Sequence, residues 1–256
     1  MIDIHTHLLP VIDTGTKTKG DAIQLARALS NQGITEAIST PRFHVSGTVT
    51  DTVEILDAVN KFQDTIDRAG FALKVYPGQE TLVSEEIFNQ ILNDKVIGLN
   101  NNLKYILVYF EDDKPGFDYI DTFKKFQASG IRPVIAHPER NRSFKTSPEL
   151  LGRFIDLGAV VQIQAGSLLG QFGKGIQNLA TDFIKYGYAH VIASEAFRVE
   201  DSRRTVKSAV AFVNKLKIKE GVNYFEDNAQ KIVDGQDIVS RDYQVIPEKR
   251  IRDYLI

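Results

Sequence analysis

Residues 2–7 read IDIHTH, and this stretch places two histidines at the end of an apolar segment. In a β-strand, residues i and i+2 point to the same face. The stretch therefore predicts a strand that aims His5 and His7 in the same direction at its C-terminal end. Because the chain contains only five histidines, this pair is a candidate for chemistry.

Six further apolar runs follow the first along the chain, separated by helix-like periods. They lack strict alternation of apolar and polar residues, which is typical of parallel strands buried on both faces. The predicted strands cover residues 2–5, 34–39, 73–77, 105–110, 133–136, 160–164 and 190–194. The predicted helices cover residues 21–31, 52–68, 85–92, 119–128, 148–157, 176–186, 205–215 and 225–233. Since no linker divides the pattern and no G-x-G-x-x-G follows a strand, it favours a single α/β domain, residues 1–256, closed or nearly closed into a barrel.

Composition excludes several classes of function. The 256 residues carry a formal net charge of -2, which gives no electrostatic reason to expect nucleic acid as a partner. The chain has no cysteine, so disulfides, thiolate nucleophiles and cysteine-based zinc sites are excluded. No stretch approaches the roughly 20 apolar residues of a membrane span, and no signal peptide is evident. We therefore expect a cytoplasmic protein without direct membrane insertion.

Metal-ligand residue types gather where the predicted strands end. Glu80 follows the third strand, His137 the fifth and Glu195 the seventh, in addition to the histidine pair after the first. In α/β barrels the functional site lies at the C-terminal strand ends. Imidazole and carboxylate together suit Zn, Mn or Fe. Each residue alone has an ordinary structural interpretation, but their coincidence at strand ends predicts a metal site.

Seven blocks of the sequence resemble a known family along nearly the whole chain. The blocks are MIDIHTHLLPVIDTG (1–15), ITEAISTP (34–41), YPGQE (76–80), KYILVYF (104–110), IRPVIAHPERNR (131–142), QIQAGSLLGQFGK (162–174) and HVIASEAFR (190–198). They resemble the bacterial PHP-family (polymerase and histidinol phosphatase) protein-tyrosine phosphatases of capsule and exopolysaccharide loci. The resemblance implies a distorted seven-stranded (β/α) barrel with three metal ions, usually manganese, that activate water to attack phosphotyrosine. It implies as partner the tyrosine-rich, phosphorylated tail of a bacterial tyrosine autokinase.

Several positions depart from the family pattern. Thr14, Arg42 and Phe197 stand where the family has an aspartate and two histidines, which resemble the ligands of a single ion. Tyr109 replaces a carboxylate and Glu195 an aspartate. Phenylalanine has no lone pair and arginine stays protonated, so we expect one or two ions rather than three. The expected ligands are His5, His7, Glu80, His137 and Glu195, with His44 and Asp13 as less favoured additions.

Arginines near the strand ends are candidate catalytic residues that hold the phosphoryl oxygens. Arg140 matches a family arginine linked to phosphate binding, Arg203 matches a second one after a one-residue shift, and Arg198 is a further candidate. For Arg42 two interpretations stay open. Its guanidinium either replaces the lost cation and binds phosphate through two hydrogen bonds, or pairs with a nearby acid.

Three functions are compatible with these features. The leading one is a metal-dependent phosphoric monoester hydrolase acting on phosphotyrosine, with activity reduced or altered by the substitutions. A second is a weakly active or inactive relative that binds the kinase tail. A third is another metallohydrolase of the PHP or amidohydrolase type, because H-x-H after the first strand also occurs in amidohydrolases.

Overall fold

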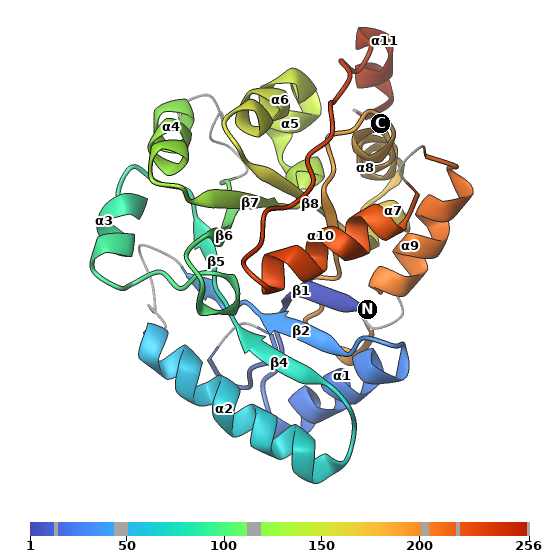
Figure 1. Ribbon diagram of the computed structural model, residues 1–256. Helices are drawn as coiled ribbons and strands as arrows, with labels where there is room; N and C mark the ends of the chain where they lie inside the picture. The colour runs from blue at the N-terminus through green and yellow to red at the C-terminus, as the bar shows by residue number, and fades with distance from the viewer. Residues whose placement is uncertain (13–14, 44–50, 112–118, 201–204, 219–220, 255–256) are drawn as a thin grey trace.

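The computed structural model describes residues 1–12, 15–43, 51–111, 119–200, 205–218 and 221–254. Strands and helices alternate along the chain, as the sequence predicts (Figure 1). The strands are β1 Ile2–Thr6, β2 Glu36–Ser39, β3 Arg42–Phe43, β4 Lys74–Pro77, β5 Glu80–Leu82, β6 Tyr105–Tyr109, β7 Arg132–Ala136, β8 Val160–Gln164 and β9 Val191–Ala193. The α-helices are α1 Lys19–Asn31, α2 Thr52–Ala69, α3 Ile87–Leu92, α4 Ile120–Ala128, α5 Arg142–Thr146, α6 Pro148–Asp156, α7 Ala165–Leu168, α8 Lys174–Lys185, α9 Val206–Lys215, α10 Asn223–Val233 and α11 Glu248–Ile251.

The strands form two parallel sheets rather than the predicted seven-stranded barrel. One sheet has the order β1-β2-β4 and the other β3-β5-β6-β7-β8-β9. Beyond the last residue of β9, a single bridge joins Thr6 to Ala196. In the part of the chain that the structure describes, the strands therefore do not close into a barrel, and the fold is a mixed α/β arrangement of parallel sheets and helices.

After two of the predicted strands, the chain crosses into a short additional strand of the other sheet, and these crossings separate the sheets. The second predicted strand ends with β2, and the chain continues through Thr40 and Pro41 into β3 of the other sheet. Pro41 has no N–H for a ladder, so a strand cannot continue regularly through it. The third predicted strand ends with β4 in the same way, just before Gly78, where a Cβ would come within 2.7 Å of the Ile38 side chain. The break at Gly78 leaves Glu80 as the first residue of β5.

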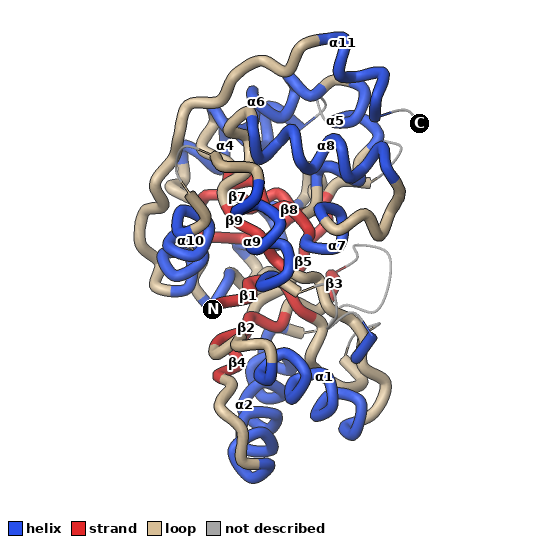
Figure 2. The backbone as a smooth tube through the Cα atoms, turned by 90° about the vertical axis from the view of Figure 1, so that its right-hand side faces the viewer, coloured by secondary structure: helices blue, strands red, loops and turns tan. Residues whose placement is uncertain are grey.

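Helices cover the outer sides of the sheets. Helices α1 and α2 lie beside the three-stranded sheet, at the lower end of the molecule in both views, whereas α4, α5, α6 and α8 lie at the opposite end (Figures 1 and 2). Helix α10 lies against β1 and β9. None of the helices formed by the described residues has the length and apolar content that crossing a membrane requires.

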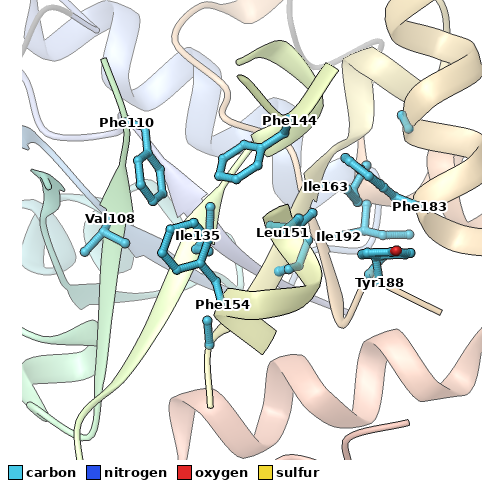
Figure 3. Close-up of a cluster of buried hydrophobic side chains, with 14 of the residues drawn as sticks. Val108, Phe110, Ile135, Phe144, Leu151, Phe154, Ile163, Phe183, Tyr188 and Ile192 are labelled. Carbon is cyan, nitrogen blue, oxygen red and sulfur yellow. The ribbon is translucent and has the colours of Figure 1, made fainter. Parts of the chain in front are cut away.

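An aromatic cluster anchors the segment that follows β7. Phe144 of α5 meets Phe110 edge-on at 5.2 Å, and Phe154 of α6 lies 5.4 Å from the same ring (Figure 3). All three rings are buried. Such aromatic pairs contribute about 0.5–1.5 kcal/mol each beyond the area they bury. The cluster therefore fixes residues 137–146, which carry two of the candidate site residues.

The C-terminal segment packs back onto the fold. The Arg250 guanidinium donates to both oxygens of Asp182 at 2.8 and 3.1 Å, and the Tyr254 hydroxyl donates to Asp182 at 2.7 Å. Asp182 and Tyr254 are buried. The C-terminal segment is therefore attached to α8 by a buried carboxylate.

Candidate active site

Four strand ends bring the predicted ligands together. His5 lies in β1, Glu80 begins β5, and His137 and Glu195 follow β7 and β9. His137 and Glu195 adopt left-handed backbone conformations, with φ of 37° and 52°. This region is uncommon for residues other than glycine, and such strain clusters at functional sites. It persists here because hydrogen bonds fix both turns: the Glu195 amide donates to the His5 carbonyl and the His137 amide to the Gln162 carbonyl, each at 2.9 Å.

Two overlapping groups of side chains have the geometry to hold an ion. Ligand atoms of His5, His7 and Glu80 lie within 4.8 Å of one another, and those of Glu80, His137 and Glu195 do the same. Glu80 belongs to both groups. His137 Nε2 lies 3.1 Å from Glu80 Oε1 and 3.7 Å from Glu195 Oε1. The spatial convergence that the sequence predicts is therefore present, with Glu80 at its centre.

His5 is arranged to offer a lone pair. Its Nδ1 lies 3.0 Å from Oε1 of Gln162, an amide oxygen that can only accept, so Nδ1 carries the proton. Nε2 is buried, makes no hydrogen bond among the described residues, and lies 3.9 Å from Glu80. Burial lowers the pKa of His5 to about 4, so the ring is neutral at neutral pH. A neutral imidazole whose other nitrogen is fixed by an acceptor is the usual state of a metal ligand, so this residue fits a divalent ion.

Two arginines balance the buried carboxylates. Arg42 Nε donates to Glu80 at 2.6 Å and its Nη2 to Glu195 at 3.4 Å, while Arg140 donates to Glu195 at 2.8 Å. Burial opposes the charge of Glu80, but the hydrogen bond from His137 and the guanidinium of Arg42 outweigh it and hold the pKa of Glu80 well below its usual value. Of the two interpretations of Arg42, the structure shows the pairing with acids.

A cavity of about 210 Å³ opens beside the arginines. Its lining consists of Arg42, Arg140, Gln164, Gln171, Phe172, Ser194, Glu195 and Phe197. The Arg140 guanidinium lies over the Phe172 ring at 4.7 Å, and the Phe197 ring stacks on His7 at 3.8 Å. The cavity thus combines cationic and aromatic walls, a suitable environment for an anion attached to a ring.

Other predicted site residues lie elsewhere. Arg198 is exposed and lines a neighbouring hollow of about 490 Å³ with Lys17 and Glu200, and it is not part of the cavity lining. Tyr109 is buried beneath Arg42, whose guanidinium lies 4.9 Å from the ring centre. Burial raises the pKa of Tyr109, so the side chain is a neutral phenol. Arg203, Asp13, Thr14 and His44 lie outside the described residues.

Sequence reasoning missed the glutamines of β8. Gln162 fixes His5, and Gln164 accepts a hydrogen bond from Arg140 at 3.2 Å. Both are buried. Their i, i+2 spacing in an otherwise apolar strand is the same signal that identified the histidine pair, so this feature was available in the sequence. Nothing in the sequence pattern indicated that Phe172 would underlie Arg140.

These features define a class: a parallel α/β protein with a candidate metal centre at its strand ends, next to a cavity lined by arginines. The chain belongs to the CpsB/CapC family of capsular polysaccharide synthesis, whose model matches residues 1–234, and the predicted resemblance is thereby confirmed.

Individual relatives agree with this assignment. The tyrosine-protein phosphatase YwqE of Bacillus subtilis is 31% identical, with 98% of each chain covered. The putative tyrosine-protein phosphatase CapC of Staphylococcus aureus is 32% identical over 78% of each chain. Among solved structures, a chain from those of Bacillus subtilis YwqE and Streptococcus pneumoniae CpsB, described as metal-dependent tyrosine phosphatases, matches with a TM-score of 0.91 and 31% identity, covering 97% of this chain and 100% of that one.

Proposed function

We propose that this protein is a metal-dependent protein-tyrosine phosphatase of capsule or exopolysaccharide synthesis. The observation that carries the proposal is the placement of His5, Glu80 and His137 beside a cavity lined by two arginines. The names of the relatives support the same activity.

The ion would be held by the two ligand groups that share Glu80, so one or two ions are expected. When bound, a divalent cation supplies Lewis-acid activation of water and neutralises phosphate charge. The mixed imidazole and carboxylate set accepts Mn, Fe or Zn, and the resemblance favours manganese. Gln162 keeps His5 in the tautomer that offers Nε2. The left-handed backbone conformation of His137 and Glu195 sets the direction in which their side chains leave the main chain.

Arg140 and Arg42 would bind the phosphoryl oxygens, since both guanidinium groups line the cavity. Charge-assisted hydrogen bonds from preorganised donors stabilise the charge that develops in phosphoryl transfer. Phe172 and Phe197 supply apolar walls for the leaving group. Phenolate leaves more readily than an alkoxide, so an aryl phosphate needs a general acid least. We therefore propose phosphotyrosine as the substrate, on the tail of a tyrosine autokinase in the cytoplasm. Arg198, in the hollow beside the cavity, would contact residues that flank the phosphotyrosine.

A second function is favoured by a specific observation. Phe197 covers one face of His7, and Arg42 already pairs with both carboxylates. These contacts are also compatible with a relative that binds the phosphorylated tail with little turnover.

One experiment separates the two functions. Purified protein is first analysed for metal. It is then assayed on a phosphotyrosine peptide before and after stripping with a chelator, and again after manganese is added. The phosphatase predicts bound metal and turnover that disappears with the chelator and returns with manganese, and His137→Gln should abolish the recovery. Peptide binding without turnover at any metal concentration would support the second function instead.

A further inference from the structure

Arg42 lies between Glu80, which both candidate ion groups share, and Glu195, which belongs to one of them. Its Nε contacts Glu80 Oε2 at 2.6 Å, and its Nη2 contacts Glu195 Oε1 at 3.4 Å. The two acids are 115 residues apart in sequence, so a single guanidinium connects β5 with the segment after β9.

The strand register places Arg42 there. In the ladder between β3 and β5, Arg42 is the direct partner of Glu80. Neighbouring residues in such a pair have side chains on the same face of the sheet. The Tyr109 ring then supports the guanidinium at 4.9 Å. The sheet register therefore determines the position of Arg42. Its side chain is largely buried, with 26% exposed.

The charges of this cluster are balanced without an ion. Glu80 and Glu195 contribute two negative charges, and Arg42 and Arg140 contribute two positive ones. His137, which also contacts both carboxylates, is counted as the neutral imidazole that a metal ligand must be. A divalent ion bound to these carboxylates would leave the cluster with a net charge of +2 while all four side chains stay in contact. A buried excess of charge is costly unless it is paired. An ion must therefore either displace a guanidinium or arrive with an anion.

We propose that Arg42 is a tethered counter-cation, which competes with the metal ion for Glu80 and Glu195 and turns to the phosphoryl group when the ion binds. The inference rests on the proposed function. Arg42 would make both contacts that the sequence left as alternatives, pairing with the acids in the metal-free state and binding phosphate in the loaded state. A phosphate dianion restores neutrality once the ion is bound. Ion and anion therefore bind cooperatively, and by linkage each raises the affinity for the other by the same factor.

The test is calorimetric titration of metal-free, full-length protein with manganese chloride, with and without phenylphosphonate, an aryl phosphate mimic that is not hydrolysed. Arg42→Met should bind manganese roughly tenfold more tightly than the wild type without the phosphonate, because a nearby positive charge is removed. Saturating phosphonate should raise the manganese affinity of the wild type by roughly tenfold and that of Arg42→Met by less than about threefold. Arg153→Met, which removes an exposed arginine of α6, is the matched control and should titrate like the wild type.

The inference is overturned if Arg42→Met binds manganese no more tightly than the wild type, or keeps the full cooperativity with phosphonate. Circular dichroism establishes whether the metal-free variant is folded. If it folds only with manganese, the loaded proteins are compared by chelator extraction, and the variant should keep its ion at roughly tenfold higher chelator concentration. No step of this test uses turnover. If the manganese affinities change as predicted but the phosphatase assay shows no turnover, only the proposed activity is refuted. If the wild type turns over substrate but Arg42→Met has the same manganese affinity as the wild type, only the role of Arg42 is refuted.

Discussion

Phe172 should set the preference for aryl over alkyl phosphates. Its ring lines the cavity and lies beneath the Arg140 guanidinium at 4.7 Å. Replacing it with alanine removes an apolar wall that a phenyl leaving group can contact. It also removes the cation–π contact that helps to hold Arg140. The first loss affects only substrates with a ring, whereas the second affects every phosphate that Arg140 binds.

The two losses have different magnitudes and can be separated. An aromatic pair contributes about 0.5–1.5 kcal/mol beyond its buried area. At 1.36 kcal/mol for each factor of ten, this corresponds to roughly a twofold to tenfold loss for phenyl phosphate. A partly exposed cation–π contact contributes about 0.5–1 kcal/mol, or roughly twofold to fivefold for either substrate. The ratio of aryl to alkyl kcat/KM should therefore fall by roughly twofold to tenfold in Phe172→Ala.

The assay compares kcat/KM for phenyl phosphate and glycerol phosphate in the wild type, Phe172→Ala and Phe172→Leu. Leucine keeps much of the apolar bulk and lacks the ring face. Its ratio of aryl to alkyl kcat/KM should lie between those of the other two proteins. Equal losses for both substrates would show that Phe172 acts only through Arg140. Unchanged kinetics would refute a role for the ring in either contact.

Two further predictions concern stability, and both are measured by chemical unfolding. Burial lowers the pKa of His190 to about 3 from its ordinary 6.5. Below pH 6.5 the unfolded chain therefore takes up a proton at this residue and the folded protein does not. As the pH is lowered, the free energy of unfolding decreases by up to about 1.4 kcal/mol per pH unit because of this residue. His190→Gln keeps an acceptor for the Val161 amide and should flatten that slope between pH 6.5 and 4.5, whereas an unchanged slope would contradict the assignment. Asp182→Asn weakens the buried contacts to Arg250 and Tyr254 and should lower the free energy of unfolding by about 1–3 kcal/mol, with kcat unchanged. Tyr254→Phe should cost less because it removes one hydrogen bond, and an equal or larger loss would contradict the central role of the carboxylate.

The sequence predicted the order of the elements because its signals are local. Every predicted strand and helix is present, since apolar runs between helical periods are determined by neighbouring residues. The closed barrel was not predictable in the same way. The division into two sheets depends on breaks at Pro41 and Gly78, and at Gly78 the reason is close contact with Ile38, a residue distant in sequence. The short strands β3 and β5 were missed for the same reason.

The candidate site was predicted in part. The convergence of His5, Glu80 and His137 followed from the rule that parallel strands end at one edge. The contact of Arg42 with two acids did not follow, because it depends on the register of β3 with β5 and on the turn after β9. The position of Arg198 in the neighbouring hollow likewise depends on how a loop leaves the sheet.

The central claim is that imidazole and carboxylate groups from four strand ends hold a divalent cation. A crystal of the protein grown with manganese, measured at the manganese absorption edge, tests it most directly. We expect an anomalous peak within about 2.0–2.3 Å of His5 Nε2 and a Glu80 oxygen, or of Glu80 and His137. Full manganese occupancy elsewhere, with Glu80 still bound only by Arg42 and His137, would contradict it.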